Sequence, residues 1–265
     1  MSIKFYFQYS GTKRNDMKFI KDAINLKKIK RIVEPFCGSC AFSLYCYREL
    51  NFKGEIILND IDKNLIEFYK DVKVNGSENY FKFVIDKYNN GKITKEEHSK
   101  LINEDKNKSL LNWFYFKRYD GRFKYLYNLK HFTIEKYQKN KDVIKSLDNF
   151  FQDKNIKLYN CDYTDIINEY KDDKYTLFYL DTPFFNSYNA GYTKYYKNLD
   201  EHNNIIDNTK IYIDIIELLK LKSKVIVSIN DNSLIRYIYK DYIFKDFKKI
   251  YQVDKKKEGQ LILKN

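Results

Sequence analysis

Apolar residues follow two spacings in turn along most of the chain. Short continuous apolar runs, typical of strands buried on both faces, alternate with stretches in which apolar residues recur every three or four positions, typical of amphipathic helices. The expected strands lie at residues 32–33, 55–58, 156–159, 175–185 and 223–231, with the clearest continuous apolar run in 175–185. The helical stretches lie at 15–28, 42–50, 63–72, 199–219 and 233–242. Repeated strand-then-helix order predicts an α/β fold with a mixed, mainly parallel sheet flanked by helices.

The alternation breaks between residues 73 and 155. Helical spacing persists in YFKFVIDKY and SLLNWFYFKRY, which are separated by a polar stretch at 89–108. We therefore expect one main domain built from residues 1–72 and 156–265, with residues 73–155 inserted as a mainly helical subdomain. The final YQVDKKKEGQLILKN predicts two antiparallel strands about a polar Lys/Glu/Gly turn at the edge of the sheet.

A glycine turn, EPFCGS at residues 34–39, joins the first expected strand to the helix at 42–50. Gly38 lets the backbone approach a ligand closely, and the start of the helix leaves N–H groups unpaired. The second expected strand ends in Asn59-Asp60, whose carboxylate suits the two hydroxyls of a ribose. Because ligands of doubly wound sheets bind at the carboxyl ends of the strands, turn and acid predict one nucleotide-binding crevice.

The apolar run in 175–185 delivers Asp181-Thr182-Pro183-Phe184 to the same carboxyl edge of the predicted sheet. Taken together and in this order, these segments resemble the Dam-type, D12-class DNA adenine-N6 methyltransferase family over nearly the whole chain. The resemblance implies a class I methyltransferase (Rossmann-like) fold. It also implies S-adenosylmethionine as cofactor, and a DNA target-recognition subdomain at residues 73–155.

Four family motifs imply cofactor contacts at single positions. They are a Y-x-G-x-K segment that closes over the cofactor, an F-x-G-x-G-like turn, an N-D pair after the second strand, and a D-Y pair that holds the cofactor adenine. The matching residues are Tyr9, Gly11, Lys13, Phe36, Gly38, Ser39, Asp60, Asp162 and Tyr163, with Asp181 as a further contact. A helix N-cap formed by Asp162 or Thr164 is the alternative interpretation of the D-Y pair.

The family's signature for methyl transfer to adenine is Asp or Asn, Pro, Pro and an aromatic residue, and Asp181, Pro183 and Phe184 match it. The N6 amine of adenine is a poor nucleophile, because its lone pair is delocalised into the ring. In this scheme Asp181 and the main-chain carbonyl of Thr182 accept the two N–H bonds, and Phe184 stacks on a base flipped out of the duplex. Thr182 stands where the family has its first proline, so the carbonyl is kept and the turn is less rigid.

Aromatic and basic side chains interleave in WFYFKRYDGRFKYLYN, residues 113–128, inside the predicted insertion. Lys117, Arg118 and Lys124 are candidates for binding DNA phosphates, and Arg122 or Asn128 for reading a base edge in the major groove. The alternative, which is compatible with the first, is that aromatic residues here form a subdomain core: Trp113, Phe114, Phe116 and Phe123. The region has no proline, unlike relatives that read GATC, so the target sequence stays open.

The formal net charge of +13 indicates a polyanionic partner, since lysine-rich surfaces attract phosphate backbones. Abundant Lys, Asn, Ile and Tyr are also what an AT-rich coding sequence produces, so charge alone does not decide the function. No stretch reaches the ~18 apolar residues of a membrane span, and the start does not read as a secretory signal. We expect a cytoplasmic monomer that acts on double-stranded DNA, with no membrane partner and no metal.

Four cysteines, Cys37, Cys40, Cys46 and Cys161, are too few and too clustered for a secreted disulfide framework. Cys37-Gly38-Ser39-Cys40 has the spacing of a thioredoxin-like redox pair, but the chain is much longer than such a unit. A zinc site lacks a second C-x-x-C or a pair of histidines to complete four ligands. Small buried thiols that pack the turn are the preferred interpretation.

The predicted reaction is direct transfer of the methyl group of S-adenosylmethionine to N6 of adenine in DNA, with base flipping and no covalent enzyme intermediate. One alternative is a catalytically weak or inactive methyltransferase-fold protein that binds nucleic acid. A second is an N-methyltransferase acting on RNA or on a glutamine amide. The order of motifs argues against the glutamine enzymes, because about a hundred residues separate the cofactor half from Asp181 here.

Overall fold

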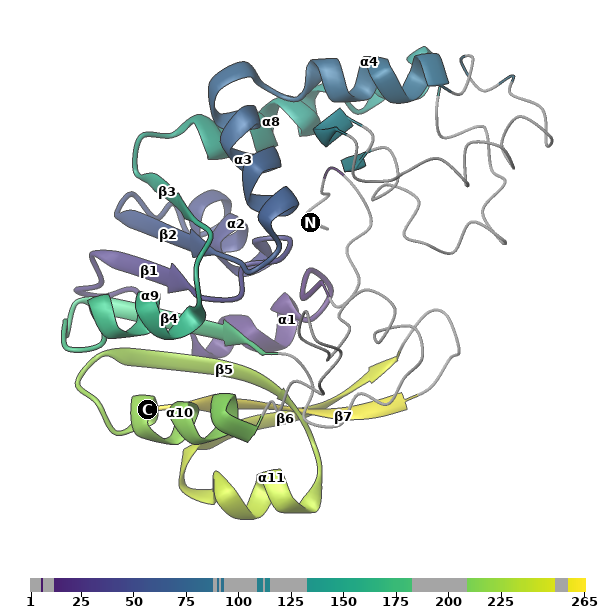
Figure 1. Ribbon diagram of the computed structural model, residues 1–265. Coiled ribbons are helices and arrows are strands. Elements are labelled where there is room, and N and C mark those ends of the chain that lie inside the picture. Colours follow the sequence, from purple (N-terminus) through teal and green to yellow (C-terminus); the bar gives the residue numbers. More distant parts are fainter. Residues whose placement is uncertain are drawn as a thin grey trace, which may run out of the picture. The chain divides into compact units, whose positions relative to one another are not determined.

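A computed structural model describes residues 6, 12–87, 90, 92, 109–111, 113–114, 133–182, 209–250 and 257–265. Its strands form one seven-stranded sheet in the order β3-β2-β1-β4-β5-β7-β6 (Figure 1). They are β1 (Arg31–Glu34), β2 (Glu55–Asn59), β3 (Ile156–Tyr159), β4 (Thr176–Asp181), β5 (Lys224–Asn230), β6 (Ile243–Ile250) and β7 (Lys257–Lys264). β4 runs parallel to β1 and β5, whereas β7 runs antiparallel to β5 and β6. The predicted mixed, mainly parallel sheet is confirmed.

Several helices begin where a polar side chain caps the first turn, which is why they follow the strands so closely. Asp62 accepts from the N–H of Leu65 at 3.2 Å, and Asn232 accepts from Ile235 at 2.9 Å. The helices are α1 (Met17–Ile20), α2 (Ala41–Arg48), α3 (Lys63–Asn75), α4 (Glu78–Lys87), α7 (Ile134–Lys139), α8 (Lys141–Gln152), α9 (Tyr163–Tyr170), α10 (Thr209–Leu219) and α11 (Ser233–Ile238), with 3₁₀ turns η1 (Lys21–Ala23) and η4 (Lys240–Tyr242).

The chain divides into two units. Unit 1 comprises residues 1–15, 38–53 and 58–161, and unit 2 comprises residues 16–37, 54–57 and 162–265. This division differs from the sequence-based one, which stays a prediction. In the predicted insertion the described helices α4, α7 and α8 have the expected helical structure.

The core of unit 1 is built from aromatic rings around α3. The Phe68 ring stacks on Phe114 at 5.0 Å between ring centroids, and the Tyr69 ring stacks on Phe151 at 4.4 Å. Trp113 and Phe114 are both buried, which confirms the core interpretation for these two of the four aromatic residues. Phe116 and Phe123 lie outside the described residues. The start of the aromatic and basic segment therefore contributes to packing.

The core of unit 2 includes α1, held against strand β6 by stacking and by ion pairs. The Phe19 ring stacks on Phe247 at 4.4 Å, and Lys249 Nζ lies 2.6 Å from the buried carboxylate of Asp16. A helix was expected over residues 15–28, but α1 and η1 end at Ala23. The chain turns there because Ile24 is extended and the Asn25 side chain accepts from the N–H of Lys27 at 3.0 Å.

The antiparallel hairpin at the end of the chain is confirmed, but its strands lie elsewhere than expected. β6 already occupies Ile243–Ile250, and Glu258 and Gly259 belong to β7 rather than to the turn. Gly259 packs so closely on Asp231 that a Cβ atom there would lie 2.7 Å from the Asp231 Cβ. Gly259, which was predicted to lie in a turn, thus allows its strand to pack closely on Asp231 because it has no side chain.

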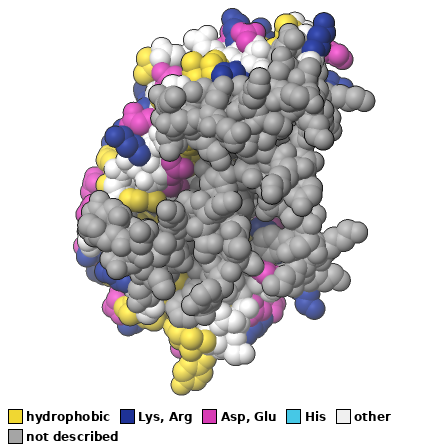
Figure 2. Space-filling model, turned by 45° about the vertical axis from the view of Figure 1, so that its right-hand side comes forward, with side chains coloured by type: hydrophobic (Ala, Val, Ile, Leu, Met, Phe, Trp, Pro, Cys, Tyr) yellow, Lys and Arg dark blue, Asp and Glu magenta, His cyan; other side chains and the backbone are white. Residues whose placement is uncertain are grey.

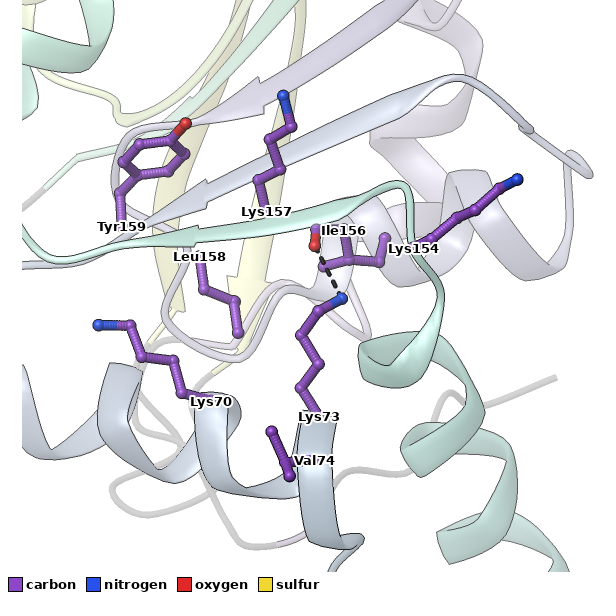
Figure 3. A pocket seen from close by; sticks show the side chains of 8 residues that line it. All are labelled: Lys70, Lys73, Val74, Lys154, Ile156, Lys157, Leu158 and Tyr159. Carbon is purple, nitrogen blue, oxygen red and sulfur yellow. Dashed lines mark hydrogen bonds between the residues drawn. The ribbon is translucent and has the colours of Figure 1, made fainter.

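Lys73, on α3, forms hydrogen bonds to the backbone of the segment that joins α8 to β3. Its ammonium group donates to the carbonyl oxygens of Phe151, Asp153 and Ile156 at 3.1, 2.8 and 3.0 Å. Figure 3 shows the Lys73 side chain reaching Ile156, while Lys157 points away on the other side of β3. The four lysines that line the pocket between α3 and β3 are Lys70, Lys73, Lys154 and Lys157. Their side chains do not converge on a common point where an anion would bind.

We expect Lys73→Met to lower the free energy of unfolding by about 2–3 kcal/mol, because three carbonyl groups lose a charged donor. Chemical denaturation of both proteins measures the difference. Lys70→Met is the matched control, since Lys70 is exposed and forms one ion pair with Glu67 at 3.2 Å. It should cost less than about 0.5 kcal/mol. Equal losses for the two variants would contradict the assigned role of Lys73.

Helix α11 of unit 2 leaves apolar side chains exposed. Figure 2 shows hydrophobic atoms gathered at the lower end of the molecule, where α11 lies in Figure 1. The exposed apolar residues of this helix are Leu234, Tyr237 and Ile238. Exposed apolar clusters are often buried between subunits, so the expected monomer stays a prediction.

Candidate active site

The glycine turn between β1 and α2 is held by a network within unit 1. Gly38 has φ +44°, a conformation that a side chain would strain. Its N–H donates to Asp60 Oδ2 at 2.9 Å, and its carbonyl accepts from the Tyr69 hydroxyl at 2.5 Å. Asp60 Oδ1 accepts from the N–H of Asp62 at 3.0 Å. The predicted neighbours Gly38 and Asp60 are therefore brought together, and Asp60 also shapes the turn.

Cys40 occupies a left-handed conformation, with φ +52° and ψ +30°, immediately before α2. It stands at the last glycine position of the F-x-G-x-G-like turn. Cys37 and Cys40 are both buried and neither forms a disulfide, which agrees with the packing interpretation of these two residues. A non-glycine residue in the left-handed region costs roughly 1–2 kcal/mol, so this turn is strained by its own sequence.

We expect Cys40→Gly to change the free energy of unfolding by less than about 1 kcal/mol, because relief of backbone strain offsets the lost thiol. Cys40→Val should cost more than about 2 kcal/mol, since a β-branched side chain tolerates a positive φ poorly. Urea unfolding of the two variants measures the contrast. A valine variant as stable as the glycine variant would show that the backbone at Cys40 is unstrained.

Asparagine side chains join the carboxyl ends of β2 and β3 in unit 1. Asn59 Nδ2 donates to the Cys161 carbonyl at 3.1 Å, and the Cys161 N–H donates to Asn59 Oδ1 at 3.0 Å. Asn160 Nδ2 donates to the Asp60 carbonyl at 2.8 Å. A positioning role for Asn59 and Asn160 was not predicted from the sequence. Ile61, which was also missed, is 67% exposed beside Asp60 and presents an apolar surface next to the carboxylate.

The N-terminal motif is described only in part. Lys13 is buried, and the neighbouring Thr12 hydroxyl lies 2.8 Å from the hydroxyl of Ser39 in the glycine turn. The segment at residues 12–13 is thus connected to the turn, as the predicted shared role requires. Tyr9 and Gly11 lie outside the described residues.

An aromatic pair lies in unit 2, where the Phe36 and Tyr163 rings are 5.1 Å apart between centroids. The Tyr163 hydroxyl donates to Asp214 Oδ2 at 2.7 Å. Burial raises the pKa of Tyr163, and the bond to Asp214 raises it further, so the phenol stays protonated at neutral pH. Asp162 Oδ1 accepts from the Thr164 N–H at 2.8 Å. The predicted N-cap of α9 is therefore present, and the Asp214 contact had no signal in the sequence.

Asp181 is the last residue of β4 and is half-buried, as expected for a carboxylate delivered to the carboxyl edge. It pairs with Ser228 of β5 in the sheet. Thr182 follows and is buried. Two residues of the signature and the five DNA-contact candidates lie outside the described residues: Pro183, Phe184, Lys117, Arg118, Arg122, Lys124 and Asn128.

One family model, that of the D12 class N6 adenine-specific DNA methyltransferases, matches residues 9–258 of this chain. The chain belongs to this D12 class. The match includes every motif from Tyr9 to Asp181 and confirms the resemblance inferred from them. The seven-stranded, mostly parallel sheet of this D12-class methyltransferase, with its flanking helices, agrees with a class I methyltransferase fold.

D12-class enzymes act on adenine in DNA, so membership favours a DNA substrate over RNA or a glutamine amide. In the described parts of this methyltransferase, no cluster of three or more His, Cys, Asp and Glu is arranged to hold a metal ion. Nor is any helix there long and apolar enough to cross a membrane. Lysines that were not predicted as DNA contacts also gather within unit 2, at a cavity whose lining includes Lys27, Lys28, Lys174, Lys222, Lys224 and Lys264.

Proposed function

We propose that this chain transfers a methyl group from S-adenosylmethionine to N6 of adenine in double-stranded DNA, directly and with the target base flipped out of the duplex. The observation that carries the proposal is Asp181. Its half-buried carboxylate ends a buried strand and begins Asp181-Thr182-Pro183-Phe184, which matches the signature for methyl transfer to adenine at three of four positions. A carboxylate held there accepts a hydrogen bond from an exocyclic amine.

The residues of the glycine turn fit a nucleoside cofactor. S-adenosylmethionine supplies a methyl group on a positively charged sulfonium. Gly38 has no side chain at a position of positive φ, which allows close backbone approach. The Asp60 carboxylate accepts from the N–H groups of Gly38 and Asp62, which fixes it beside the glycine turn at the carboxyl end of β2. We assign it to the ribose hydroxyls and Ile61 to one face of the cofactor adenine.

The aromatic pair and the N-terminal segment complete the proposed cofactor contacts. Phe36 and Tyr163 offer flat rings, and the bond from Tyr163 to Asp214 fixes one of them. The Asp162 carboxylate accepts from Thr164 through Oδ1, and we assign its remaining capacity to the adenine amine. Lys13 and Ser39 are assigned to the same cofactor, together with Tyr9 and Gly11 from outside the described residues.

Asp181 and the main-chain carbonyl of Thr182 are proposed to accept the two N–H bonds of the target amine. These two acceptors would favour a tetrahedral nitrogen whose lone pair is available to the sulfonium methyl group of a bound cofactor. The Asp181 carboxylate would also accept the proton that the amine must release once it is methylated. The protein contributes orientation and complementary charge rather than a covalent intermediate. Phe184 is assigned to stacking on the flipped base, and Lys117, Arg118, Arg122, Lys124 and Asn128 to the duplex.

The test is to incubate the protein with methyl-labelled S-adenosylmethionine and unmethylated duplex DNA of random sequence. The DNA is then digested to nucleosides, which are separated. Label is expected in N6-methyldeoxyadenosine, and sequencing of the methylated positions gives the target. Cofactor binding without label in any DNA or RNA would instead favour a non-catalytic relative, for which Thr182 in place of proline is the motivating observation.

A further inference from the structure

A row of polar side chains extends from Asp181 across two neighbouring strands of unit 2. Asp181 of β4 pairs with Ser228 of β5, and Asn230 of β5 pairs with Gln260 of β7. Paired residues project to the same face of a sheet, as do residues two apart on a strand. Asp181, Ser228, Asn230 and Gln260 therefore share one face, and we call them the polar row.

The polar row contains buried atoms whose hydrogen-bonding capacity is unused within the described part of the chain. Gln260 is 0% exposed, yet its Oε1 has no hydrogen-bond partner there. The same holds for Asn230 Oδ1. Buried polar groups are nearly always paired. Two such atoms in the row that contains the signature carboxylate indicate capacity for a ligand.

Gln260 is held rigidly enough for recognition. It pairs with Asn230 on one side and with Phe247 of β6 on the other. The adjacent Gly259 packs on Asp231, whose N–H donates to the Gly259 carbonyl at 2.9 Å. Gln260 Nε2 donates to the same carbonyl at 3.1 Å, which fixes the amide orientation. One N–H of Nε2 is thereby used, so the side chain offers a second N–H beside the unpaired Oε1.

The separation of Gln260 from Asp181 suits a base. Two steps across the sheet and two residues along a strand place their Cα atoms roughly 12 Å apart, from ordinary strand spacings. Two side chains and one amine can span that separation. An amide with an acceptor beside a donor complements the edge of adenine where the N6 amine adjoins a ring nitrogen.

We propose that Gln260 is a specificity-determining residue that holds the flipped adenine. Its Oε1 shares, as a second acceptor, the N6 N–H that is assigned to the Thr182 carbonyl, and the second N–H of Nε2 donates to the adjoining ring nitrogen. The proposal rests on the proposed function. It places a second side-chain acceptor beside the amine in a chain that has threonine in place of the first signature proline. Asn230 and Ser228 form the wall between Gln260 and Asp181.

The test compares Gln260→Met with the unchanged protein on duplexes that carry the target mapped by the random-sequence experiment. The target base is adenine, 1-deazaadenine or 7-deazaadenine, so that each neighbour of the amine is removed in turn. We expect the variant to lose about 10- to 100-fold in kcat/KM on adenine, as for the loss of one to two hydrogen bonds. On one of the two deaza bases both proteins should be slow. On that base the ratio of kcat/KM between the unchanged protein and the variant should be markedly smaller than on adenine.

Stability and cofactor affinity separate this role from a structural one. Gln260→Met keeps the side-chain length and removes an unpaired buried acceptor, so its melting temperature should be unchanged or higher. Its affinity for S-adenosylmethionine by calorimetry should also be unchanged. Gln138→Met, at an exposed position on α7, is the control and should keep full activity. Gln260→Glu retains an acceptor, and it serves if the methionine variant does not fold.

Three outcomes would overturn the proposal. The first is full activity of Gln260→Met. The second is that Gln260→Met loses the same factor in kcat/KM on both deaza bases as it loses on adenine. The third is full activity of Gln260→Glu on all three bases. The first or second would mean that Gln260 is solvated by a buried water only. Absence of N6-methyladenine with the unchanged protein on every DNA would count against the proposed function instead.

Discussion

Replacing Asp181 with alanine is expected to lower the rate of methyl transfer to DNA by at least about 10³-fold. The carboxylate ends β4 and is proposed to accept a hydrogen bond from the target amine as its nitrogen becomes tetrahedral. A fixed acceptor at the point where positive charge develops contributes on the order of 10²–10⁴-fold. Single-turnover transfer of labelled methyl to the mapped target duplex measures the loss.

Cofactor affinity distinguishes this result from general damage. S-adenosylmethionine should still bind to Asp181→Ala within about tenfold, since most of the proposed contacts come from other strands. Asp172→Ala is the matched control, because Asp172 is exposed in the turn before β4, and this variant should keep full activity. Transfer by Asp181→Ala within tenfold of the unchanged protein would remove the residue from the chemistry.

Replacing Asp60 with alanine is expected to weaken S-adenosylmethionine binding by about 100-fold or more. Two effects add, because the variant loses the proposed acceptor of the ribose hydroxyls and leaves the N–H groups of Gly38 and Asp62 without their carboxylate. Loss of charge-assisted bonds at a buried site costs roughly 1.5–3 kcal/mol each. Isothermal calorimetry with the cofactor alone measures the change without any DNA.

Asp60→Asn separates the two effects, since one amide oxygen still accepts from the backbone. It should restore most of the stability lost in Asp60→Ala and only part of the affinity. Asp86→Ala, at an exposed position on α4, is the control and should bind the cofactor normally. Unchanged affinity in Asp60→Ala would show that this carboxylate shapes the turn and does not touch the cofactor.

The strands, and the acidic residues that follow two of them, were predictable because two strong local signals coincide there. Buried strands such as β4 read as continuous apolar runs, and Asp181 and Asp60 follow two of them directly. Short helices were harder to predict. Apolar spacing predicted 14 helical residues from Asn15, whereas α1 and η1 end at Ala23 because Ile24 is extended and Asn25 forms a turn.

Partners distant in the sequence could not be predicted from any local pattern. The bonds from Tyr69 to Gly38 and from Tyr163 to Asp214 join residues 31 and 51 positions apart, and no periodicity specifies them. The same applies to Gln260. From the sequence, the residues around Gln260 were predicted to form a turn beside an edge strand. Only the register of strands β4 to β7 places Gln260 in one row with Asp181.

Strand β7 lies between β5 and β6 although it follows both of them in the chain. During translation β6 therefore emerges before β7, the strand that connects it to the rest of the sheet. The edge of β5 stays unpaired until residues 257–264 are available. Until those residues leave the ribosome, Ser228 and Asn230 of β5 lack their pairing partners on β7. Nascent or prematurely terminated chains should consequently expose a strand edge to chaperones and proteases.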